Sequence, residues 1–436
     1  MPLSSSGPSR PAHPSLTPLG ESRDTLVVGA GPVGCVTALT QARAGRRVTL
    51  VDSRRGLPTR LAGEWLHPPA VTLLRELGVD LGSDEASYAG RGFVVFPDDG
   101  SAPILLDYPD ARCGASLAHE HLVSRLRHAA EDHPLVDLRL GCTVERSEHR
   151  GQVRVRDAAG APGRAEPKAR LGRVPAKDRA AEQLGVGLLV AADGRASTLR
   201  RDLGLHRQPL PVSHTAGLLL RDVELPFEGY GHVFLGGAGP LLAYRIGDDV
   251  VRLCVDVPST SIRCADKRAL LWDGYAHRLP PPLREALRRA LEAKDLAWAA
   301  NHFAERRCFA GEGAALVGDA VGYYHPMTAA GMTLGFFDAM ALAEEPNLEA
   351  YQERRRRECR VPQLLAQTLY RVFSEQDGAM HAMRQGVYEL WRKDPAERSR
   401  TMALLAGYPQ PLHHFAAPLA KVLGRATTLV SAPRGR

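Results

Sequence analysis

The sequence predicts an α/β fold in which a Rossmann-like dinucleotide-binding domain carries an inserted antiparallel sheet and is followed by C-terminal helices. Three observations predict this fold. An apolar strand near the N-terminus leads into a glycine-rich turn, two later apolar strands end in Asp-Gly and Gly-Asp, and alternating segments lie between these motifs. The motif order makes the dinucleotide-binding domain discontinuous along the chain.

The first element is the strand Thr25-Leu26-Val27-Val28, which leads into the turn and helix start at residues 29–34, GAGPVG. Glycines at this spacing permit a tight turn and let the backbone approach a pyrophosphate, whose charge then faces the helix N-terminus. The second strand, residues 47–51, ends at the distance where an acid accepts hydrogen bonds from the adenosine ribose. The expected contacts to a dinucleotide, either FAD or NAD, are Gly29, Gly31, Gly34 and Asp52.

Two later strand ends favour FAD. Residues 188–192 form an apolar strand followed by Asp193-Gly194, and residues 314–317 form another followed by Gly318-Asp319. These pairs resemble the DG and GD motifs of flavoprotein monooxygenases, in which the GD carboxylate holds the ribityl chain. We therefore expect a GR2-type FAD-binding domain. In that family, the helix starting near Gly331-Met332 presents its N-terminal amides to the flavin pyrimidine edge, where they stabilise negative charge.

A narrower resemblance lies around the second of these pairs. Residues 325–333, HPMTAAGMT, resemble the HPLTGGGMT signature of squalene monooxygenase, also called squalene epoxidase. Residues 60–66, RLAGEWL, are similar to that family's R-x-x-G-E-L-L, and residues 251–258, VRLCVDVP, are similar to its VRCLVDVP strand. The similarity runs from about residue 24 to past residue 420. Further contacts to FAD implied by the resemblance are Arg60, His121 (at a family arginine), Pro326, Gly331 and Met332.

The resemblance also implies a reaction. Reduced FAD and O2 form a flavin hydroperoxide that epoxidises a carbon–carbon double bond of a hydrophobic isoprenoid or polyene, such as squalene. Reducing equivalents come from NADPH or NADH, either directly or, as we favour, through a flavin or cytochrome-type reductase. Because the cofactor makes the bonds, this chemistry requires no protein nucleophile and no metal.

The chain departs from the family pattern at several positions. Ala329 and Ala330 stand where the family has glycine, so we expect the turn to avoid positive φ there. His67 and Phe93 replace a family glutamine and tyrosine near the expected pocket. The catalytic candidates are His325, for which orientation of the turn is the favoured role, and His67. The expected pocket residues are Trp65, His67, Phe93, Leu241, Tyr324 and Phe336; for Tyr324, packing in the core is the alternative.

Other functions stay open at this point. A hydroxylase of an aromatic or prenylated aromatic intermediate, the main alternative, would need a group such as His67 or His325 to deprotonate a phenol. An isoprenoid reductase on a related flavin scaffold would saturate the double bond instead. A flavin-binding protein without turnover is a third alternative.

Chain length and composition predict the organisation. A chain of 436 residues is long enough for two domains or for one domain with large insertions. Residues 1–23, rich in Ser and Pro, are expected to be a disordered leader. Residues 156–186 are expected to be an exposed excursion. The predicted parts are the FAD-binding domain (24–88, 112–212 and 299–345), the substrate domain (89–111 and 213–298) and a C-terminal helical region (346–436).

Charge and cysteine usage bear on partners and location. From residue 351 onward fifteen Lys or Arg face seven Asp or Glu, while the chain as a whole has a net charge of +7. This basic region predicts either a solvated helical face or peripheral contact with an anionic membrane. No aromatic-interleaved groove accompanies it, so nucleic acid is not an expected partner. Seven cysteines without a CxxC pair favour reduced thiols. The expected location is therefore cytoplasmic, with a place on the inner face of a membrane as the alternative.

Overall fold

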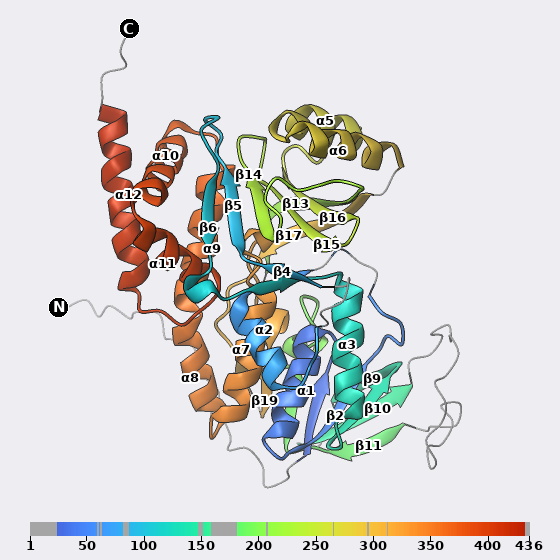
Figure 1. Ribbon diagram of the computed structural model, residues 1–436. Coiled ribbons are helices and arrows are strands. Elements are labelled where there is room, and N and C mark those ends of the chain that lie inside the picture. The colour runs from blue at the N-terminus through green and yellow to red at the C-terminus, as the bar shows by residue number, and fades with distance from the viewer. Residues whose placement is uncertain are drawn as a thin grey trace, which may run out of the picture.

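The computed structural model describes residues 24–431 except 59, 60, 62, 82–86, 147–150, 158–180, 206, 207, 265, 294, 295 and 312. The expected leader, residues 1–23, lies outside the described residues, as does most of the expected excursion at 156–186. Figure 1 shows two main bodies, with the dinucleotide-binding domain below, a second sheet above it, and the last helices along one side.

The dinucleotide-binding domain is built on a six-stranded sheet with the order β18-β19-β12-β1-β2-β8. All neighbours are parallel except β18 and β19. Apolar residues such as Leu26, Val27 and Val190 are fully buried in its strands, as expected for a parallel sheet covered on both faces. The strands are β1 (Asp24–Val28), β2 (Arg47–Asp52), β8 (Val136–Leu140), β12 (Leu188–Ala191), β18 (Ala310–Gly311) and β19 (Ala314–Leu316).

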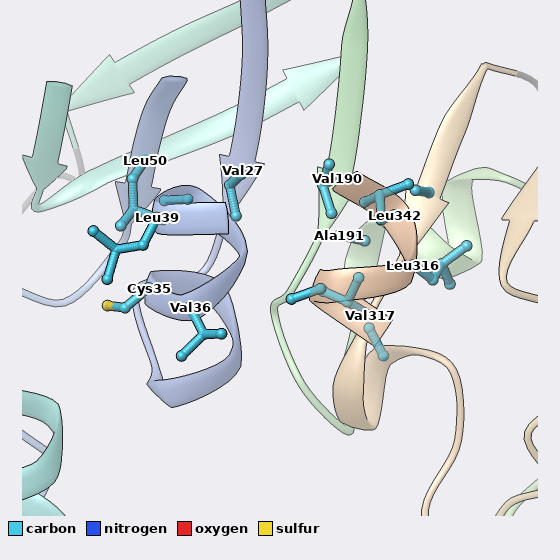
Figure 2. Close-up of a cluster of buried hydrophobic side chains, with 14 of the residues drawn as sticks. Val27, Cys35, Val36, Leu39, Leu50, Val190, Ala191, Leu316, Val317 and Leu342 are labelled. Carbon is cyan, nitrogen blue, oxygen red and sulfur yellow. The ribbon is translucent and has the colours of Figure 1, made fainter. Parts of the chain in front are cut away.

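Helices pack against this sheet and form one apolar core with it. Helix α1 (Pro32–Arg43) contacts α3 (His119–Asp132) and α7 (Gly331–Glu344). Figure 2 shows Val36 and Leu39 of α1 and Leu342 of α7 in the same cluster as the strand residues. The shorter helices of this part are α2 (Pro68–Glu76) and α4 (Thr198–Asp202).

Two small antiparallel sheets flank the dinucleotide-binding domain. One has the order β11-β10-β9, and the other has the order β3-β7-β4 and lies between the two main bodies (Figure 1). Their strands are β3 (Trp65–Leu66), β4 (Tyr88–Gly90), β7 (Gly114–Ser116), β9 (Cys142–Arg146), β10 (Gln152–Asp157) and β11 (Glu182–Gly185).

The upper body contains a seven-stranded sheet with the order β17-β13-β16-β15-β14-β5-β6. A hairpin turn at 247–249 joins β15 to β16, and helix α6 (Pro281–Ala293) packs against the sheet with its apolar face. The sheet is not wholly antiparallel, because β14 pairs in parallel with β5. Its strands are β5 (Gly92–Phe96), β6 (Ile104–Asp107), β13 (Leu210–Arg221), β14 (Tyr230–Phe234), β15 (Leu241–Gly247), β16 (Val250–Pro258) and β17 (Leu296–Phe303).

Two of the expected domain boundaries fall inside strands of this sheet. The boundary at 212/213 cuts β13, and the boundary at 298/299 cuts β17, which continues to Phe303. Both strands pair along their length with each other, so they belong to the upper sheet as a whole. The residue pattern predicted where these strands lie, but the strand that each one pairs with sets where it begins and ends.

Helices cover both faces of the upper sheet. Helices α5 (Lys267–Tyr275) and α6 share one apolar cluster with β13, β15 and β16. The helices after residue 359 share another cluster with β5 and β6, and those of residues 360–393 lie beside these strands in Figure 1, whereas the helix at 348–358 packs on the core of the dinucleotide-binding domain. The C-terminal helices are α8 (Leu348–Glu358), α9 (Arg360–Ser374), α10 (Gly378–Lys393), α11 (Pro395–Leu405) and α12 (His413–Ser431).

Candidate active site

The motif-bearing strand ends meet at one edge of the six-stranded sheet. Parallel pairing sets Val28 of β1 beside Val51 and Ala191, and it sets Ala191 beside Leu316 of β19. Because these neighbouring strands point the same way, the glycine turn and the acids at 52, 193 and 319 all follow their carboxyl ends. The structure therefore brings together the three motifs that are expected to bind one dinucleotide.

The glycine turn after β1 has the close packing that its sequence predicts. Gly29 has φ 107°, and a Cβ on Gly34 would lie 1.7 Å from the carbonyl oxygen of Gly29. A Cβ on Gly31, by contrast, would meet no heavy atom of the described residues within 4 Å. The turn is thus closed toward the protein at Gly29 and Gly34 and open at Gly31, which fits a phosphate approaching at the start of α1.

Asp52 is held at the end of β2 by the same turn. Its Oδ2 accepts a hydrogen bond from the Ala30 amide at 2.8 Å and lies 3.6 Å from Nη2 of Arg127. The buried Arg127 side chain also donates to the Ala30 carbonyl at 3.0 Å. Sequence reasoning missed Arg127. The available signal was a basic residue on the buried face of α3, between Leu126 and Ala130.

Asp193 has an unused oxygen at the end of β12. Its Oδ2 accepts hydrogen bonds from Thr198, at 2.9 Å from the amide and at 3.3 Å from the hydroxyl. Its Oδ1 is buried and has no hydrogen-bond partner among the described residues. Buried carboxylate oxygens almost always have a donor, so this atom fits a ligand hydroxyl or amide. Gly194 follows in the left-handed region, with φ 79°.

Asp319 is linked to the Asp193-Gly194 motif through Arg195, the next residue in the chain. Nε of Arg195 lies 3.2 Å from Oδ2 of Asp319, and the Arg195 guanidinium lies 5.0 Å from the centroid of the Tyr323 ring. Both side chains of the ion pair are partly exposed, at 43% for Arg195 and 35% for Asp319. The two motifs that resemble DG and GD are therefore in direct contact.

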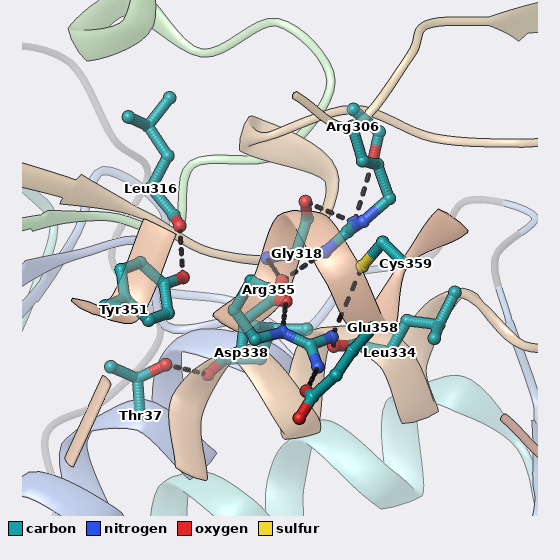
Figure 3. A network of polar contacts seen from close by, with 12 residues as sticks. Thr37, Arg306, Leu316, Gly318, Leu334, Asp338, Tyr351, Arg355, Glu358 and Cys359 are labelled. Atoms are coloured by element: carbon teal, nitrogen blue, oxygen red, sulfur yellow. Dashed lines mark hydrogen bonds and ion pairs between the residues drawn. The ribbon is translucent and has the colours of Figure 1, made fainter. Parts of the chain in front are cut away.

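A buried ionic network fixes the backbone of the GD turn (Figure 3). Asp338 of α7 accepts a hydrogen bond from the Gly318 amide at 2.8 Å and pairs with Arg306 and with Arg355 of α8. Arg306 in turn donates to the carbonyls of Gly318 and Gly322, both at 2.9 Å. All three charged side chains are at most 2% exposed. None of them was predicted, because the residues next to each of them in the sequence do not distinguish a buried charged side chain from a solvated one.

His325 uses both ring nitrogens inside the protein. Its Nδ1 accepts from the Met327 amide at 3.2 Å, so Nε2 carries the proton and donates to Oδ1 of Asp256 at 2.8 Å. The ring stacks on Tyr370 with centroids 4.1 Å apart. Asp256 also bonds Ser213, and Asn301 lies in the same buried cluster. These contacts favour the orienting role of His325 over proton transfer to a substrate.

The turn after His325 corrects one expectation about its backbone. Residues Pro326–Thr328 form a 3-10 turn, and Ala329 follows with φ 51° and ψ 12°. The expectation that both alanines avoid positive φ was therefore wrong for Ala329 and correct for Ala330, which has φ −84°. The Ala329 amide donates to the Pro326 carbonyl at 2.9 Å, and this closure imposes the left-handed conformation. Gly331 then begins α7, and a Cβ there would meet nothing within 4 Å of the described residues.

His67 lies at the start of α2 and contacts Tyr108, which follows β6. Nδ1 of His67 is 2.6 Å from the Tyr108 hydroxyl, and Nε2 is 3.0 Å from the Thr328 carbonyl. The Trp65 indole donates to the same hydroxyl at 3.0 Å. Burial lowers the pKa of His67 to about 4 and raises that of Tyr108 above its usual range. A neutral imidazole that is already paired on both sides is a poor base for a substrate.

The expected pocket residues divide among several clusters. Trp65, His67 and Phe93 lie together, with the Phe93 ring 5.0 Å from Trp65 and 6.1 Å from His67. Leu241 instead belongs to the cluster of α5 and α6, while its neighbour Leu242 packs against the cluster that contains Trp65 and Phe93. The expectation for Leu241 was off by one residue, which in a strand reverses the face.

The other two aromatic candidates also lie apart from this group. Phe336 is fully buried in the core of the dinucleotide-binding domain, because its side of α7 faces the sheet. Tyr324 packs with Phe303 and Leu334 in a separate small cluster, which is the core role left open for it. Neither ring adjoins Trp65 or Phe93.

The remaining expected contacts differ in what the structure says of them. His121 is exposed on the first turn of α3. Pro326 is exposed at the start of its turn, and Met332 packs partly against the core of the dinucleotide-binding domain. Arg60 lies outside the described residues.

The basic C-terminal region is partly neutralised within the protein. Arg354 pairs with Glu344, Glu345 and Glu358, and Arg355 belongs to the buried network around Asp338. Among the described helices, none has both the length and the hydropathy needed to cross a membrane. All seven cysteines are free thiols.

Comparison with known proteins agrees with this architecture. A family model described as squalene epoxidase matches residues 186–422, which is more than half of the chain. The chain belongs to the squalene epoxidase family. Squalene epoxidase 3 of Arabidopsis thaliana is 29% identical over 92% of this chain and 78% of its own length. Squalene epoxidase erg1 of Aspergillus fumigatus is 28% identical over 85% of this chain and 79% of its own length.

Solved structures show the same fold. The flavin-dependent brominase Bmp2 superposes with a TM-score of 0.71 at 18% identity, covering 91% of this chain and 96% of that chain. The predicted fold class and the resemblance to the squalene epoxidase family are both confirmed. Family membership makes the chain a flavin-dependent monooxygenase, and it implies FAD and O2 as cofactor and co-substrate.

Proposed function

We propose that the strand ends of the six-stranded sheet bind one FAD. The open side of the turn at Gly31 would take the pyrophosphate, and Asp52 would take the adenosine ribose. The unpaired Oδ1 of Asp193 and the carboxylate of Asp319 would accept hydrogen bonds from ribityl or ribose hydroxyls. The start of α7 at Gly331 would face the flavin ring. The orphaned Asp193 oxygen supports this proposal most directly.

We propose further that the protein epoxidises a carbon–carbon double bond of a hydrophobic isoprenoid or polyene, similar to squalene. Relatives named for squalene epoxidation align over most of the chain. The aromatic group of Trp65, Phe93 and Tyr244 supports an apolar substrate, because its rings pack within 5.8 Å of Trp65 and are buried. This alignment with epoxidases is the single observation that carries the substrate assignment.

The residues of the chain have supporting roles in this reaction. FAD, when bound, supplies the activation of O2. Asp338 and its two arginines hold the GD turn, and His325 holds the Pro326 turn against Asp256. Buried aromatic side chains exclude water from the substrate side. The proposed reaction requires no side chain to donate or accept a proton. This agrees with the structure, in which both ring nitrogens of His67 and of His325 already have hydrogen-bond partners.

Hydroxylation of an aromatic or prenylated aromatic compound is the second candidate. The aromatic group that contains Trp65 and Phe93 suits an arene as well as an alkene. A hydroxylase also needs a base for the phenol, and the paired ring nitrogens of His67 and His325 weigh against that role.

Reducing equivalents would come from NADPH or NADH through a separate reductase. Arg356 and Arg357 are exposed on α8, which leaves peripheral contact with a membrane open.

One experiment tests the proposal. The FAD-loaded protein is incubated with NADPH, a flavin reductase, O2 and, in parallel, squalene, a linear polyene and a prenylated phenol, and the products are weighed by mass spectrometry. We expect an alkene product that gains one oxygen and is opened by acid to a diol. A phenolic product gaining one oxygen would favour the second candidate. A product gaining two hydrogens, or a protein that binds no FAD, would contradict both.

A further inference from the structure

The carbonyl of Thr328 is held by a histidine from a distant part of the chain. His67 lies at the start of α2, and its Nε2 is 3.0 Å from that oxygen. A carbonyl oxygen can only accept, so Nε2 carries the proton and donates. The buried, neutral ring then has a lone pair on Nδ1, which accepts from the Tyr108 hydroxyl at 2.6 Å.

The Tyr108 hydroxyl is in turn fixed by Trp65. The indole Nε1 can only donate, and it lies 3.0 Å from the Tyr108 oxygen. The directions are therefore determined along the whole chain of hydrogen bonds, from Trp65 through Tyr108 and His67 to Thr328. Trp65, Tyr108 and His67 are at most 3% exposed, so water does not compete for these groups.

The held carbonyl immediately precedes the strained residue of the turn. Ala329 has φ 51°, a conformation that costs an L-residue about 1–2 kcal/mol. Such a conformation persists only where the surroundings over-determine it. The contacts that do so are the bond from the Ala329 amide to Pro326, the bond from His67 to Thr328, and packing of Met327 and Ala329 against the cluster that contains Trp65 and Tyr108.

We propose that Trp65, Tyr108 and His67 form a positioning relay that sets the Pro326–Gly331 turn against the flavin ring from the substrate side. Tyr108 directly follows a strand of the upper sheet, His67 directly precedes a helix of the lower body, and Thr328 lies in the turn before α7. Phe93, a pocket residue of the proposed function, adjoins both Trp65 and His67. The relay therefore lies between the aromatic residues proposed to contact the substrate and the turn proposed to contact the flavin.

This inference rests on the proposed FAD site and makes a further claim about it. If the relay positions the turn, loss of one of its hydrogen bonds changes the surroundings of the flavin without touching the flavin itself. The bound flavin then reports on the relay through its visible absorption spectrum, its midpoint potential and its dissociation constant. None of these readouts requires turnover or a known substrate.

The test uses four variants of the full chain. Tyr108→Phe removes only the hydroxyl, and His67→Leu removes the donor and the acceptor together. His67→Gln is the conservative variant, because its amide retains one donor and one acceptor. Tyr388→Phe is the matched control, because it removes a buried phenol hydroxyl from the same apolar cluster, and that hydroxyl donates to Asp98 at 3.0 Å and not to a residue of the relay.

We expect Tyr108→Phe and His67→Leu to weaken FAD binding by roughly tenfold, the effect of one lost hydrogen bond with the turn reorganised, and to shift the flavin absorption spectrum. His67→Gln should return both properties most of the way to the parent values. Tyr388→Phe should keep both properties even though it lowers the melting temperature. Parental FAD affinity and spectra in folded Tyr108→Phe and His67→Leu would overturn the relay, and so would a His67→Gln protein that is as impaired as His67→Leu.

A second measurement separates this inference from the proposed function. Amide hydrogen exchange of residues 326–332 is measured in the flavin-free parent, Tyr108→Phe and Tyr388→Phe proteins. Faster exchange in Tyr108→Phe alone supports the relay even if the parent binds no FAD, in which case only the proposed function fails. Equal exchange in all three proteins rules out the relay even if the parent binds FAD well.

Discussion

Ala329 adopts a left-handed backbone at the centre of the proposed flavin turn, and its neighbour Ala330 does not. Glycine has no penalty at positive φ but loses more entropy on folding. We therefore expect Ala329→Gly to stabilise the protein by about 0.5–1 kcal/mol and Ala330→Gly to destabilise it by a similar amount. Urea unfolding of the two variants measures the difference. Equal effects at both positions would contradict the assigned backbone.

His67 is a buried histidine, and protonation of its ring at low pH opposes folding. Its pKa is lowered to about 4 by burial, below its usual value of 6.5, so the unfolded chain binds a proton that the native state does not. Stability from this residue is complete above about pH 6.5 and is lost as the pH falls toward about 4. His232 is shifted to about 4 for the same reason.

Each of these histidines should lower the free energy of unfolding by about 2 kcal/mol when the pH falls from about 7.5 to 5. We expect His67→Gln to remove roughly half of the combined loss, with His232→Gln as the matched comparison. Urea unfolding at the two pH values, in parent and variants, measures it. A parent protein that is no less stable at the lower pH would contradict both shifts.

At the scale of elements, the packing of α7 and α8 against the end of β19 depends on one carboxylate. Asp338 lies between Arg306 and Arg355 and also accepts from the Gly318 amide (Figure 3). Removing one member of a buried charged group leaves its partners uncompensated, which typically costs about 3–5 kcal/mol. The network thus ties two helices to the turn that carries Asp319.

We expect Asp338→Asn to lower the free energy of unfolding by about 3 kcal/mol and to loosen FAD binding, because the GD turn loses its anchor. The matched control is Glu285→Gln, which breaks an ion pair with Arg288 on the exposed face of α6. That variant should change neither property, since exposed pairs contribute little. Denaturant unfolding and FAD titration check both, and similar losses in the two variants would contradict the assigned role.

At the scale of the whole molecule, the proposed FAD site joins segments that are far apart in the sequence. Residues 29–34, 193 and 319 follow strands that pair only in the folded sheet. A ligand that binds all three therefore binds the native state and not the unfolded chain. Such binding stabilises the native state by about 2.7 kcal/mol when free ligand is at 100 times its dissociation constant.

We expect FAD to raise the melting temperature of the parent and to do so much less in Asp193→Ala, because the buried Oδ1 then no longer meets the ligand. Asp202→Ala, which removes an exposed carboxylate at the end of α4, is the control and should respond to FAD as the parent does. Comparing each variant with and without FAD separates ligand binding from any change in intrinsic stability. An unchanged FAD response in Asp193→Ala would contradict the assignment.

The parts of this protein that depend on local residue pattern could be predicted from its sequence. The strands that are followed by GAGPVG, Asp-Gly and Gly-Asp could be recognised because strand periodicity and glycine turns depend on residues that are neighbours in the sequence. The squalene epoxidase resemblance followed from the same motifs, and the family and fold were confirmed. Trp65, His67 and Phe93 were expected in one pocket from that resemblance; their rings lie close together, and their role as a pocket stays a prediction.

The side chains that meet across those motifs could be identified only in the folded protein. Asp338 and Tyr108 gave no local signal, and Arg127 gave only its place on the buried face of α3, because a buried charge or phenol differs from an exposed one mainly through partners that lie far along the chain. Leu241 was assigned to the wrong face for a related reason, since register with neighbouring strands selects the face. Long-range pairing sets these contacts, and a linear pattern carries no information about it.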